Sequence, residues 1–344
     1  MKFAINGFGR IGRTGFRVWY EKHADKGELV VVNTSGSMDL EGWAHLLKYD
    51  SNYGVWSVLI KTEVHQKKDE VSDEDPLLGY FHVGSHTVAV LAQRDPAKLP
   101  WSSLGVETVI ESTGKFISKE QASAHLAAGA KRVVISAPPK GGDVGTYVLG
   151  VNESPGSGIE SNASCTTNCV APVAAIMHEV FRVKKAMMST MHSYTDDQNL
   201  QDNSHHDLRR ARSAAMNIIP TTTGAAISVT ETIPELKGLF SGVAYRVPTR
   251  TGSLSEMVFL VEKPTTVEEV NQAFVKAADH PRWRGIIGVT NEPIVSSDII
   301  GRSESAIVDL ALTQVVDGDM VKVVAWYDNE WGYCNRLIEQ VVMG

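Results

Sequence analysis

The sequence predicts an α/β protein of two domains, in which a doubly wound, mainly parallel sheet is followed by an α+β domain with a large mixed sheet. Three observations predict this class. The chain has 344 residues, which is enough for two hydrophobic cores. Short apolar runs alternate with helical patterns up to about residue 151, and longer β-rich runs predominate after about residue 160.

The N-terminal segment has the pattern of a βαβ unit. Residues 2–6 form a short apolar run, and a glycine-rich turn follows at 7–12. Residues 11–23 carry apolar side chains among polar ones, as a helix does. Glu28–Asn33 is apolar on both faces, which is typical of a buried parallel strand. Strand, crossover helix and strand within about 30 residues are the elements of a βαβ unit.

The remainder of the first domain continues this alternation. A charge-rich stretch at 61–76 is interpreted as a solvated loop or hairpin. We expect helices at 39–48 and Lys119–Ala128, and strands within 80–92 and at Glu107–Glu111, Arg132–Ser136 and Tyr147–Val151.

The second domain is predicted to be richer in strands. A helix is expected from near Cys165 to about His178, and further helices at Thr266–Asp279 and Tyr333–Met343. The expected strands are Ala186–Met191, Leu239–Val247, Ser255–Val261, Ile307–Leu312 and Val321–Tyr327.

Composition limits the class of protein. The formal net charge is -7, which argues against sequence-independent binding to nucleic acid. An odd, small number of cysteines (three) favours a reducing compartment over a disulfide framework. No apolar run reaches the ~20 residues of a membrane helix, and the N-terminal residues lack a signal-peptide pattern. We therefore expect a cytoplasmic protein that binds neither membrane nor nucleic acid.

The turn after the first strand matches G-x-G-x-x-G through Gly7, Gly9 and Gly12. It follows a strand and opens a helix, which is the context this pattern needs. The first glycine permits a tight turn, the second a close approach of the backbone to a pyrophosphate, and the third close packing of helix on strand. The helix N-terminus supplies N–H groups and a favourable dipole. The sequence therefore predicts a Rossmann domain that binds a dinucleotide.

The second strand ends in Asn33-Thr34-Ser35, without the carboxylate that usually takes the ribose hydroxyls. A carboxylate would repel a 2′-phosphate, whereas Thr34 and Ser35 can donate hydrogen bonds to one. This favours tolerance of, or preference for, NADP. The alternative is that Asp39, the nearest carboxylate, or a backbone group serves the ribose of NAD.

Cys165 is a candidate nucleophile because it stands at the predicted start of a helix, where the dipole favours a thiolate. Cys169, one turn on, is interpreted as a packing thiol, since the pair lacks further ligands at zinc spacing. A thiolate nucleophile needs a base. His192 follows a predicted strand, but spacing alone leaves His205 and His206 as equal candidates.

Six segments together resemble the glyceraldehyde-3-phosphate dehydrogenases. They occur in that family's order from Ile5 to about Leu337, and SNASCTTNC is highly specific by itself. The segments are NGFGRIGR, SNASCTTNC, MHSYT, LRRARSAAMNIIPTTTGAA, YRVPT and WYDNEWGYCNRL.

The resemblance implies a Rossmann domain over 1–163, joined by the C-terminal helix at about 329–344, and a catalytic domain over 164–328. It also implies a homotetramer. By the same resemblance, Cys165 is the nucleophile and His192 its base. The implied reaction oxidises glyceraldehyde 3-phosphate through a thiohemiacetal and a thioester, which inorganic phosphate releases as an acyl phosphate.

The resemblance also implies the residues that bind ligands, and no metal. The site for the substrate phosphate would use Thr195 and Arg246, and the site for the attacking phosphate Ser164, Thr166, Arg210, Thr223 and Gly224. Guanidinium and hydroxyl groups suit such anions. For NAD or NADP, the implied residues are Gly7, Gly9, Arg10, Ile11, Gly12, Asn33, Thr34, Ser35, Arg94, Thr113, Gly114 and Asn329.

The chain departs from the family's pattern at three places. NAD-specific members carry Asp at the position of Thr34 and often Pro at that of Ser204, so both departures favour use of NADP. The stretch Arg250–Ser253 is also unusual, and the sequence supplies no functional account of it.

Three other functions compete with this one. Erythrose-4-phosphate dehydrogenase is the nearest alternative, and the presence of Thr195 disfavours it. A cysteine hydrolase or acyltransferase using Cys165 would not need the dinucleotide fingerprint. A purely binding protein is disfavoured by the complete catalytic set.

Overall fold

A computed structural model describes residues 1–343 of the chain, which form two compact units. The first unit consists of Met1–Thr146, Ser154–Asn162 and the chain from Leu337 onward. The second consists of Tyr147–Glu153 and Ala163–Arg336. Each unit has its own sheet and its own buried apolar core.

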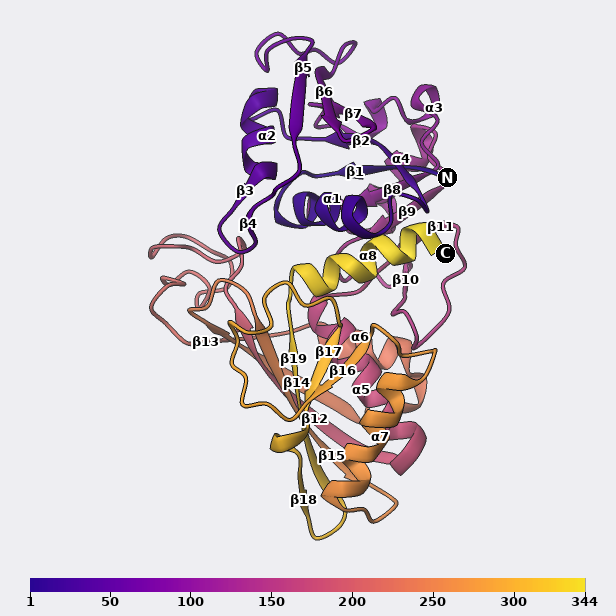
Figure 1. The fold of residues 1–344 in the computed structure, drawn as a ribbon, viewed down its shortest axis with the longest axis vertical. Helices are drawn as coiled ribbons and strands as arrows, with labels where there is room; N and C mark the ends of the chain where they lie inside the picture. The colour runs from indigo at the N-terminus through magenta and orange to yellow at the C-terminus, as the bar shows by residue number, and fades with distance from the viewer. Residues whose placement is uncertain (344) are drawn as a thin grey trace. The chain divides into compact units, whose positions relative to one another are not determined.

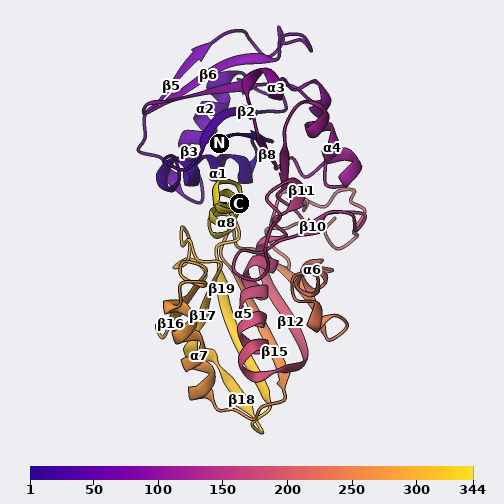
Figure 2. The ribbon, with the colours of Figure 1, turned by 90° about the vertical axis from the view of Figure 1, so that its right-hand side faces the viewer.

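The sheet of the first unit has one long parallel section and an antiparallel edge (Figures 1 and 2). Its strands are β1 (Lys2–Asn6), β2 (Glu28–Asn33), β5 (Ile60–Val64), β6 (Leu77–Val83), β7 (His86–Leu91), β8 (Thr108–Glu111), β9 (Arg132–Ile135), β10 (Gly145–Thr146) and β11 (Gly158–Ser161). Within residues 1–343 their order is β10-β11-β9-β8-β1-β2-β7-β6-β5. The pairs from β10 to β7 are parallel, whereas β6 pairs antiparallel with both β7 and β5.

The first unit packs helix α1 (Arg10–Lys22) against this sheet through aromatic side chains. Its helices are α1 (Arg10–Lys22), α2 (Leu40–Lys48), α3 (Trp101–Leu104) and α4 (Lys119–Ala127), and β3 (Tyr49–Asp50) and β4 (Gly54–Val55) form a small hairpin. Phe16 and Trp19 are fully buried on the inner face of α1. Trp19 meets Phe3 of β1 edge-to-face, and Phe16 meets Phe8, each at 6.1 Å between ring centroids. This packing holds α1 directly behind the glycine-rich turn.

The second unit combines a mixed sheet with a long buried helix. Its strands are β12 (Val183–Ser193), β13 (Ile219–Thr221), β14 (Phe240–Val247), β15 (Ser253–Val261), β16 (Ile287–Thr290), β17 (Ala306–Asp309), β18 (Gln314–Val316) and β19 (Met320–Tyr327). Its helices are α5 (Cys165–Phe181), α6 (Ala225–Thr232) and α7 (Val267–Asp279). Figure 2 shows α5 and α7 lying along one face of this sheet, with α5 packed against β15, β17 and β19.

The C-terminal helix α8 (Trp331–Met343) begins in the second unit and ends in the first. In the first unit, the buried Arg132 binds its last turn by donating to the carbonyl oxygen of Gln340 at 2.8 Å. Glu160 compensates the buried charge by pairing with Arg132. No helix within residues 1–343 is long and apolar enough to span a membrane.

The predicted class, a parallel α/β unit followed by an α+β unit, is confirmed. The strand expected at Tyr147–Val151 is wrong: these residues form a turn in which the Val148 carbonyl accepts from the N–H of Val151 at 2.9 Å. Their apolar character reflects the burial of Val148 in the core of the second unit. The strand at this edge of the sheet is the short β10, and the next is the glycine-containing β11, which has no apolar alternation that a sequence pattern detects.

Candidate active site

Cys165 is the first residue of α5. The hydroxyl of Ser164 caps this helix by accepting a hydrogen bond from the N–H of Thr167 at 3.0 Å. Ala163, just before the cap, has a φ of 58°, a left-handed conformation uncommon for a residue with a Cβ. Cys165 is partly exposed, so the fold presents its thiol at the positive end of a helix dipole.

His192 lies near the end of β12, with its Nε2 3.3 Å from Cys165 Sγ. Its Nδ1 lies 2.7 Å from the carbonyl oxygen of Ser193. Because a carbonyl only accepts, Nδ1 carries the proton, and the neutral ring leaves Nε2 as an acceptor facing the thiol. Burial, and then the positive charge of Arg246, lower the pKa of His192 to about 3. The ring is therefore neutral at pH 7 and can accept a proton from Cys165.

The Cys165 thiol needs this base. Burial raises its pKa, and the charge of Arg246 acts in the opposite direction. A thiol with a raised pKa is mostly protonated at neutral pH, and only the thiolate is a good nucleophile. Cys169 is fully buried and its pKa is raised by that burial, which suits a packing role. Across residues 1–343, no three His, Cys, Asp or Glu side chains gather as a metal site requires.

Tyr327 is a buried neighbour that sequence reasoning missed. Its hydroxyl lies 2.9 Å from Thr166 Oγ1 and 2.8 Å from Thr190 Oγ1, and burial raises its pKa well above the usual value. The hydroxyl of Thr166, one of the predicted phosphate ligands, is therefore directed toward this phenol. Only the pairing of β19 with β15, which no local pattern specifies, brings Tyr327 here.

Arg246 and Thr195 form a cationic site beside the histidine. The parallel register of β12 and β14 pairs Arg246 with His192. The Arg246 guanidinium donates to Thr195 Oγ1 at 2.8 Å and to the Ser193 carbonyl at 3.3 Å. Burial lowers its pKa, yet a guanidinium remains protonated at neutral pH. The structure thus brings together two residues that are far apart in the sequence.

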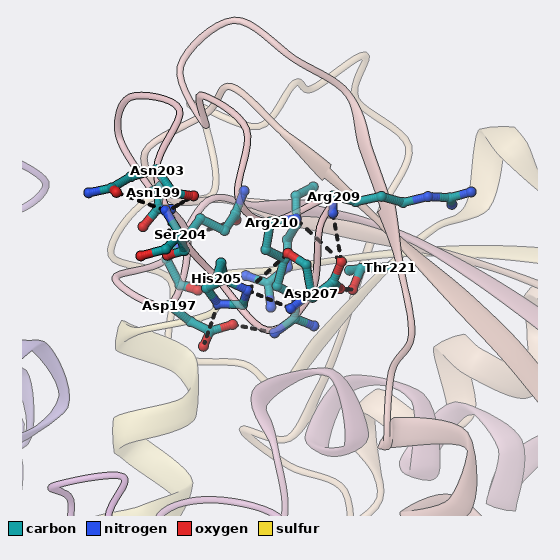
Figure 3. A network of polar contacts seen from close by, with 12 residues as sticks. Asp197, Asn199, Asn203, Ser204, His205, Asp207, Arg209, Arg210 and Thr221 are labelled. Carbon is teal, nitrogen blue, oxygen red and sulfur yellow. Dashed lines mark hydrogen bonds and ion pairs between the residues drawn. The ribbon is translucent and has the colours of Figure 1, made fainter.

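Arg210 lies in the loop between β12 and β13, within a polar network (Figure 3). Its guanidinium pairs with Asp197 and donates to Thr221 Oγ1 at 3.0 Å and to the Thr222 carbonyl at 3.3 Å. Its side chain is 18% exposed, so it is not a freely solvated surface charge. Asp207, 3.5 Å from Arg210 Nε, was also missed by sequence reasoning, because no spacing distinguishes it from other surface acids.

The remaining predicted residues of this unit fall around the same loop. The rings of His205 and His206 stack at 4.3 Å. His205 Nδ1 accepts from the N–H of Asp207 at 2.9 Å, so His205 is hydrogen-bonded within the loop (Figure 3). Thr223 Oγ1 accepts from an N–H of α6, and Gly224 is the residue preceding that helix.

The first unit contains a cavity of about 410 Å³ at the carboxyl ends of its parallel strands. Seven of the predicted cofactor residues line it: Gly7, Gly9, Asn33, Thr34, Ser35, Arg94 and Thr113. Sequence reasoning missed the other lining residues, Asn6, Phe8, Trp43, Gln93, Ser112, Lys115 and Phe116. Ligands of doubly wound sheets bind at this edge.

The three fingerprint glycines have different local environments. Gly7 has a φ of 99°, and a Cβ there would meet the backbone of Ser112 at 2.7 Å. A Cβ at Gly12 would lie 2.1 Å from the Gly7 carbonyl oxygen. A Cβ at Gly9 would meet nothing within 4 Å, so the cradle that it would fill is open. An open cradle at the N-terminus of α1, whose first turn holds no acidic residue, fits a pyrophosphate.

Arg10 and Ile11, which also belong to the predicted fingerprint, do not line this cavity. The Arg10 guanidinium forms an ion pair with Asp50 and lies 5.9 Å from the centroid of the Tyr53 ring. Ile11 follows it within the first turn of α1. Gly114 has a φ of 71° and open space around its Cα, which allows the turn after β8.

The contact that Thr34 makes in this cavity differs from the prediction. The buried Thr34 hydroxyl donates to the Leu91 carbonyl at 3.0 Å. The Asp39 carboxylate accepts from the N–H of Lys68 at 2.7 Å and does not line the cavity. A second cavity of about 290 Å³ adjoins the first, sharing Ser35, Gln93 and Arg94. Lys68 and Asp73 also line it, and Asp73 is paired with Lys98.

A buried carboxylate supports the predicted Thr113. Glu111 accepts from both the N–H and the hydroxyl of Thr113, and its Oε2 lies 3.0 Å from His125 Nε2. His125 is fully buried and accepts at Nδ1 from the Trp101 indole N–H at 3.0 Å. Sequence reasoning missed this relay, because its members lie on three separate elements.

Asn329, predicted to anchor a carboxamide, is buried in the second unit with 5% of its surface exposed. Its Oδ1 accepts from the hydroxyl of Ser253 at 2.8 Å and from the N–H of Gly252 at 3.1 Å. The Arg250–Ser253 stretch, for which the sequence supplied no account, therefore contacts a predicted ligand residue.

Comparison with known proteins assigns the chain to a family. Residues 1–119 match the model of the glyceraldehyde 3-phosphate dehydrogenase NAD binding domain, and residues 164–329 that of the C-terminal domain of the same enzymes. The chain is 48% identical to "Glyceraldehyde-3-phosphate dehydrogenase" of Streptomyces coelicolor, over 99% of this chain and 98% of that protein. It is also 48% identical to "Glyceraldehyde-3-phosphate dehydrogenase GAPB, chloroplastic" of Arabidopsis thaliana, over 98% of this chain and 73% of that protein.

A third relative, "Glyceraldehyde-3-phosphate dehydrogenase 1" of Bacillus cereus, is 46% identical over 98% of this chain and 96% of that protein. The similarity covers both units and includes the cavity of the first and the cysteine–histidine pair of the second. The chain therefore belongs to the glyceraldehyde-3-phosphate dehydrogenase family.

Proposed function

We propose that the chain catalyses the phosphorylating oxidation of D-glyceraldehyde 3-phosphate to 1,3-bisphosphoglycerate with NAD or NADP. The single observation that carries this proposal is the 3.3 Å contact between Cys165 Sγ and His192 Nε2, in a ring whose other nitrogen donates to the Ser193 carbonyl. This tautomer supplies a base aimed at a nucleophile. The family membership of the chain supports the same reaction.

In the proposed reaction, Cys165 attacks the aldehyde carbon while its proton passes to His192 Nε2. His192 returns this proton to the aldehyde oxygen, which gives a neutral thiohemiacetal and leaves Nε2 free to act as a base again. His192 then removes the proton of the hydroxyl group. A nicotinamide dinucleotide, when bound, supplies the hydride acceptor for this oxidation. Cys165 is left as a thioester, and inorganic phosphate attacks it to release the acyl phosphate and the free thiol. The N–H of Cys165 and the ring of His192 are the proposed donors to the oxyanion.

Two anion sites serve the proposed substrates. Arg246 and Thr195, which are hydrogen-bonded to each other beside His192, are proposed to bind the phosphate of the aldehyde. The attacking phosphate is assigned to Ser164, Thr166, Arg210, Thr223 and Gly224. Arg210 meets Asp197 in the structure, so we propose that the incoming anion shares or displaces this pairing.

The cofactor is proposed to be either NAD or NADP. The absence of a carboxylate from the lining of the main cavity and the presence of Lys68 and Arg94 along the adjoining one support acceptance of a 2′-phosphate. Thr34 supports the acceptance of NADP through its lack of charge, because its hydroxyl already donates to the Leu91 carbonyl. Replacing it by Asp would place a negative charge beside the ribose. Thr34→Asp is expected to lower kcat/KM for NADP about 100-fold and that for NAD by less than threefold.

The organisation of the protein is proposed by resemblance to the family. The NAD(P)-binding domain would cover 1–163 together with the C-terminal helix, and the catalytic domain 164–328. A homotetramer is proposed as the assembly. A cytoplasmic location is proposed because all three cysteines are free and Cys165 must stay reduced for catalysis.

The proposed function is tested by initial rates of NADH or NADPH formation from glyceraldehyde 3-phosphate at saturating phosphate. We expect turnover with both cofactors, at rates within about tenfold, which corresponds to ~1.4 kcal/mol in transition-state stabilisation. The Cys165→Ser protein should be inactive. Activity in that variant, or no turnover by the native protein with either cofactor, would contradict the proposal. Product formation that does not need phosphate would favour erythrose-4-phosphate-dehydrogenase-like hydrolysis.

A further inference from the structure

The stretch Arg250–Ser253 surrounds the amide oxygen of Asn329. Gly252 has a φ of 90°, and a Cβ there would lie 2.3 Å from the Ser296 carbonyl oxygen. This position therefore requires glycine. The resulting turn aims the Gly252 N–H at Asn329 Oδ1, at 3.1 Å.

Two donors hold that oxygen, and a third hydroxyl, whose single proton is shared with Asp328, lies beside it. Besides Gly252, the hydroxyl of Ser253 donates to Asn329 Oδ1 at 2.8 Å, and the hydroxyl of Thr251 lies within 3.3 Å. A backbone N–H can only donate, so the atom that faces it must be the oxygen of the amide and not its nitrogen. The side chain is therefore locked in one of its two orientations. Its Nδ2 forms no hydrogen bond with any group of residues 1–343.

Ser253 also connects this amide to the proposed base. Its Oγ accepts from the N–H of Ser193 at 3.1 Å while it donates to Asn329. The carbonyl of the same Ser193 accepts from His192 Nδ1. The Ser253 hydroxyl thus joins Ser193, the residue whose carbonyl orients His192, to the amide of Asn329, and all these groups are buried.

The carboxylate of Asp328 fixes the backbone next to Asn329. Asp328, fully buried, accepts from the N–H groups of Glu330 and Trp331, each at 2.9 Å, at the start of α8. It also accepts from the Thr251 hydroxyl at 3.1 Å. The backbone on either side of Asn329 is therefore fixed independently of its side chain, so the orientation of the amide depends on Thr251, Gly252 and Ser253.

We propose that Thr251 and Ser253 are positioning residues that fix the Asn329 amide with Nδ2 outward, so that the enzyme presents a hydrogen-bond donor to the carboxamide of nicotinamide and selects a pyridine that carries an acceptor oxygen. This inference rests on the proposed function, in which Asn329 meets that carboxamide. It assigns a role to a stretch that the family resemblance leaves unexplained.

The test is calorimetric titration of the purified protein with two dinucleotides modified on the pyridine ring. The 3-acetylpyridine dinucleotide keeps the acceptor oxygen, whereas the 3-aminopyridine dinucleotide offers only donors. The native protein should bind the first at least about tenfold more tightly, as expected for one hydrogen bond gained and one donor left unpaired. In Thr251→Val/Ser253→Ala the Gly252 N–H still donates to Oδ1, but the support of both hydroxyls is lost. The amide should therefore turn over more readily, and the ratio of the two dissociation constants should narrow to within about threefold.

Two matched variants separate positioning from general damage. Thr251→Ser/Ser253→Thr alters the same two side chains but keeps both hydroxyls, and it should keep the native ratio. Thr232→Val removes another buried hydroxyl, bonded to the Val229 carbonyl in α6, and should leave the ratio unchanged. If the double variant does not fold, Ser253→Ala alone is the substitute, with the same direction of change expected.

A ratio of dissociation constants that is the same in the native protein and in Thr251→Val/Ser253→Ala would overturn the inference while leaving the proposed function intact. A narrowed ratio in Thr232→Val as well would also overturn it, because the change would then reflect loosened packing. Failure of the native protein to bind NAD would instead refute the proposed function on which the inference rests.

Discussion

The cavity of the first unit and the cysteine–histidine site of the second are built from different parts of the chain. The cavity is shaped by backbone: Gly7 turns the chain, Gly12 lets α1 pack on it, and Gly9 leaves an open cradle. The site around Cys165 is shaped by side chains, since its partner His192 and the cationic Arg246 come from two neighbouring strands.

This difference teaches where each site is sensitive. A backbone-built site keeps its shape when the charge of a side chain changes, but it fails when a Cβ is added at Gly7 or Gly12, because atoms at about 2–3 Å cannot be accommodated. A side-chain-built site keeps its shape when one group is replaced but loses its chemistry, because each group has one role.

The largest expected effect follows from replacing the base. In His192→Asn the amide retains much of the ring's volume but cannot take the thiol proton, so kcat should fall by about 10²–10⁴. The rate of Cys165 alkylation by iodoacetamide at pH 7 should fall as well. The free energy of unfolding at pH 7 should change little. Native-like alkylation and turnover in this variant would show that another group is the base.

Next come the two arginines, which distinguish the two anion sites. Arg246→Ala should raise KM for glyceraldehyde 3-phosphate, with a loss of about 10–100-fold in kcat/KM for one charge-assisted contact. Arg210→Ala should instead raise KM for inorganic phosphate by a similar factor. Steady-state kinetics with each substrate varied in turn would check this. If both variants affect the same substrate, the assignment of the two sites is wrong.

The glycines of the fingerprint test the backbone-built site. Gly12→Ala places a Cβ 2.1 Å from the Gly7 carbonyl, so it should lower the free energy of unfolding by about 1–3 kcal/mol. Gly9→Ala should leave stability unchanged, because no atom lies within 4 Å of its Cβ, and should weaken NAD binding by filling the cradle. Denaturant midpoints and calorimetric NAD titration on both variants would measure this. Equal stability losses in the two would contradict the contrast.

The smallest effect concerns pH. The pKa of His192 is lowered to about 3 in the folded protein, against about 6.5 in an unfolded chain. Between these values the unfolded chain binds a proton that the folded one does not, so this stability contribution is complete above pH 6.5 and is lost as the pH falls. The slope should reach at most ~1.4 kcal/mol per pH unit.

His192→Asn lacks this contribution. Urea midpoints of the native protein should therefore fall more steeply from pH 7 to pH 5 than those of the variant, with all carboxylates contributing equally to both. Parallel slopes in the two proteins would mean that His192 titrates normally in the folded state.

The same contrast explains which site residues could be predicted from the sequence. Half of the residues that line the cavity were predicted, among them Gly7, Gly9 and Thr34, which lie within or at the end of one βαβ unit. From the residues alone, His192 could not be distinguished from His205 or His206. Only the family resemblance selected it, because the register of β12 is a long-range property.

Residues whose role depends on such long-range pairing were missed altogether. Strand pairing in the second sheet places Tyr327 within hydrogen-bond distance of Thr166. Glu111 of β8 likewise contacts His125 of α4. Asp197 pairs with Arg210 inside an irregular loop that no pattern describes. The false strand at Tyr147–Val151 has the same origin, since these residues belong to the second unit and Val148 packs into the core of that unit.

The most direct test of the central claim is a single-turnover experiment without phosphate. The native protein is mixed rapidly with excess NAD and glyceraldehyde 3-phosphate, and NADH is followed by absorbance while the acylated peptide is identified by mass. We predict a burst of about one NADH per chain, with the acyl group on Cys165, followed by slow turnover until phosphate is added. Continuous turnover without phosphate, or a burst with no acyl group on Cys165, would contradict the account.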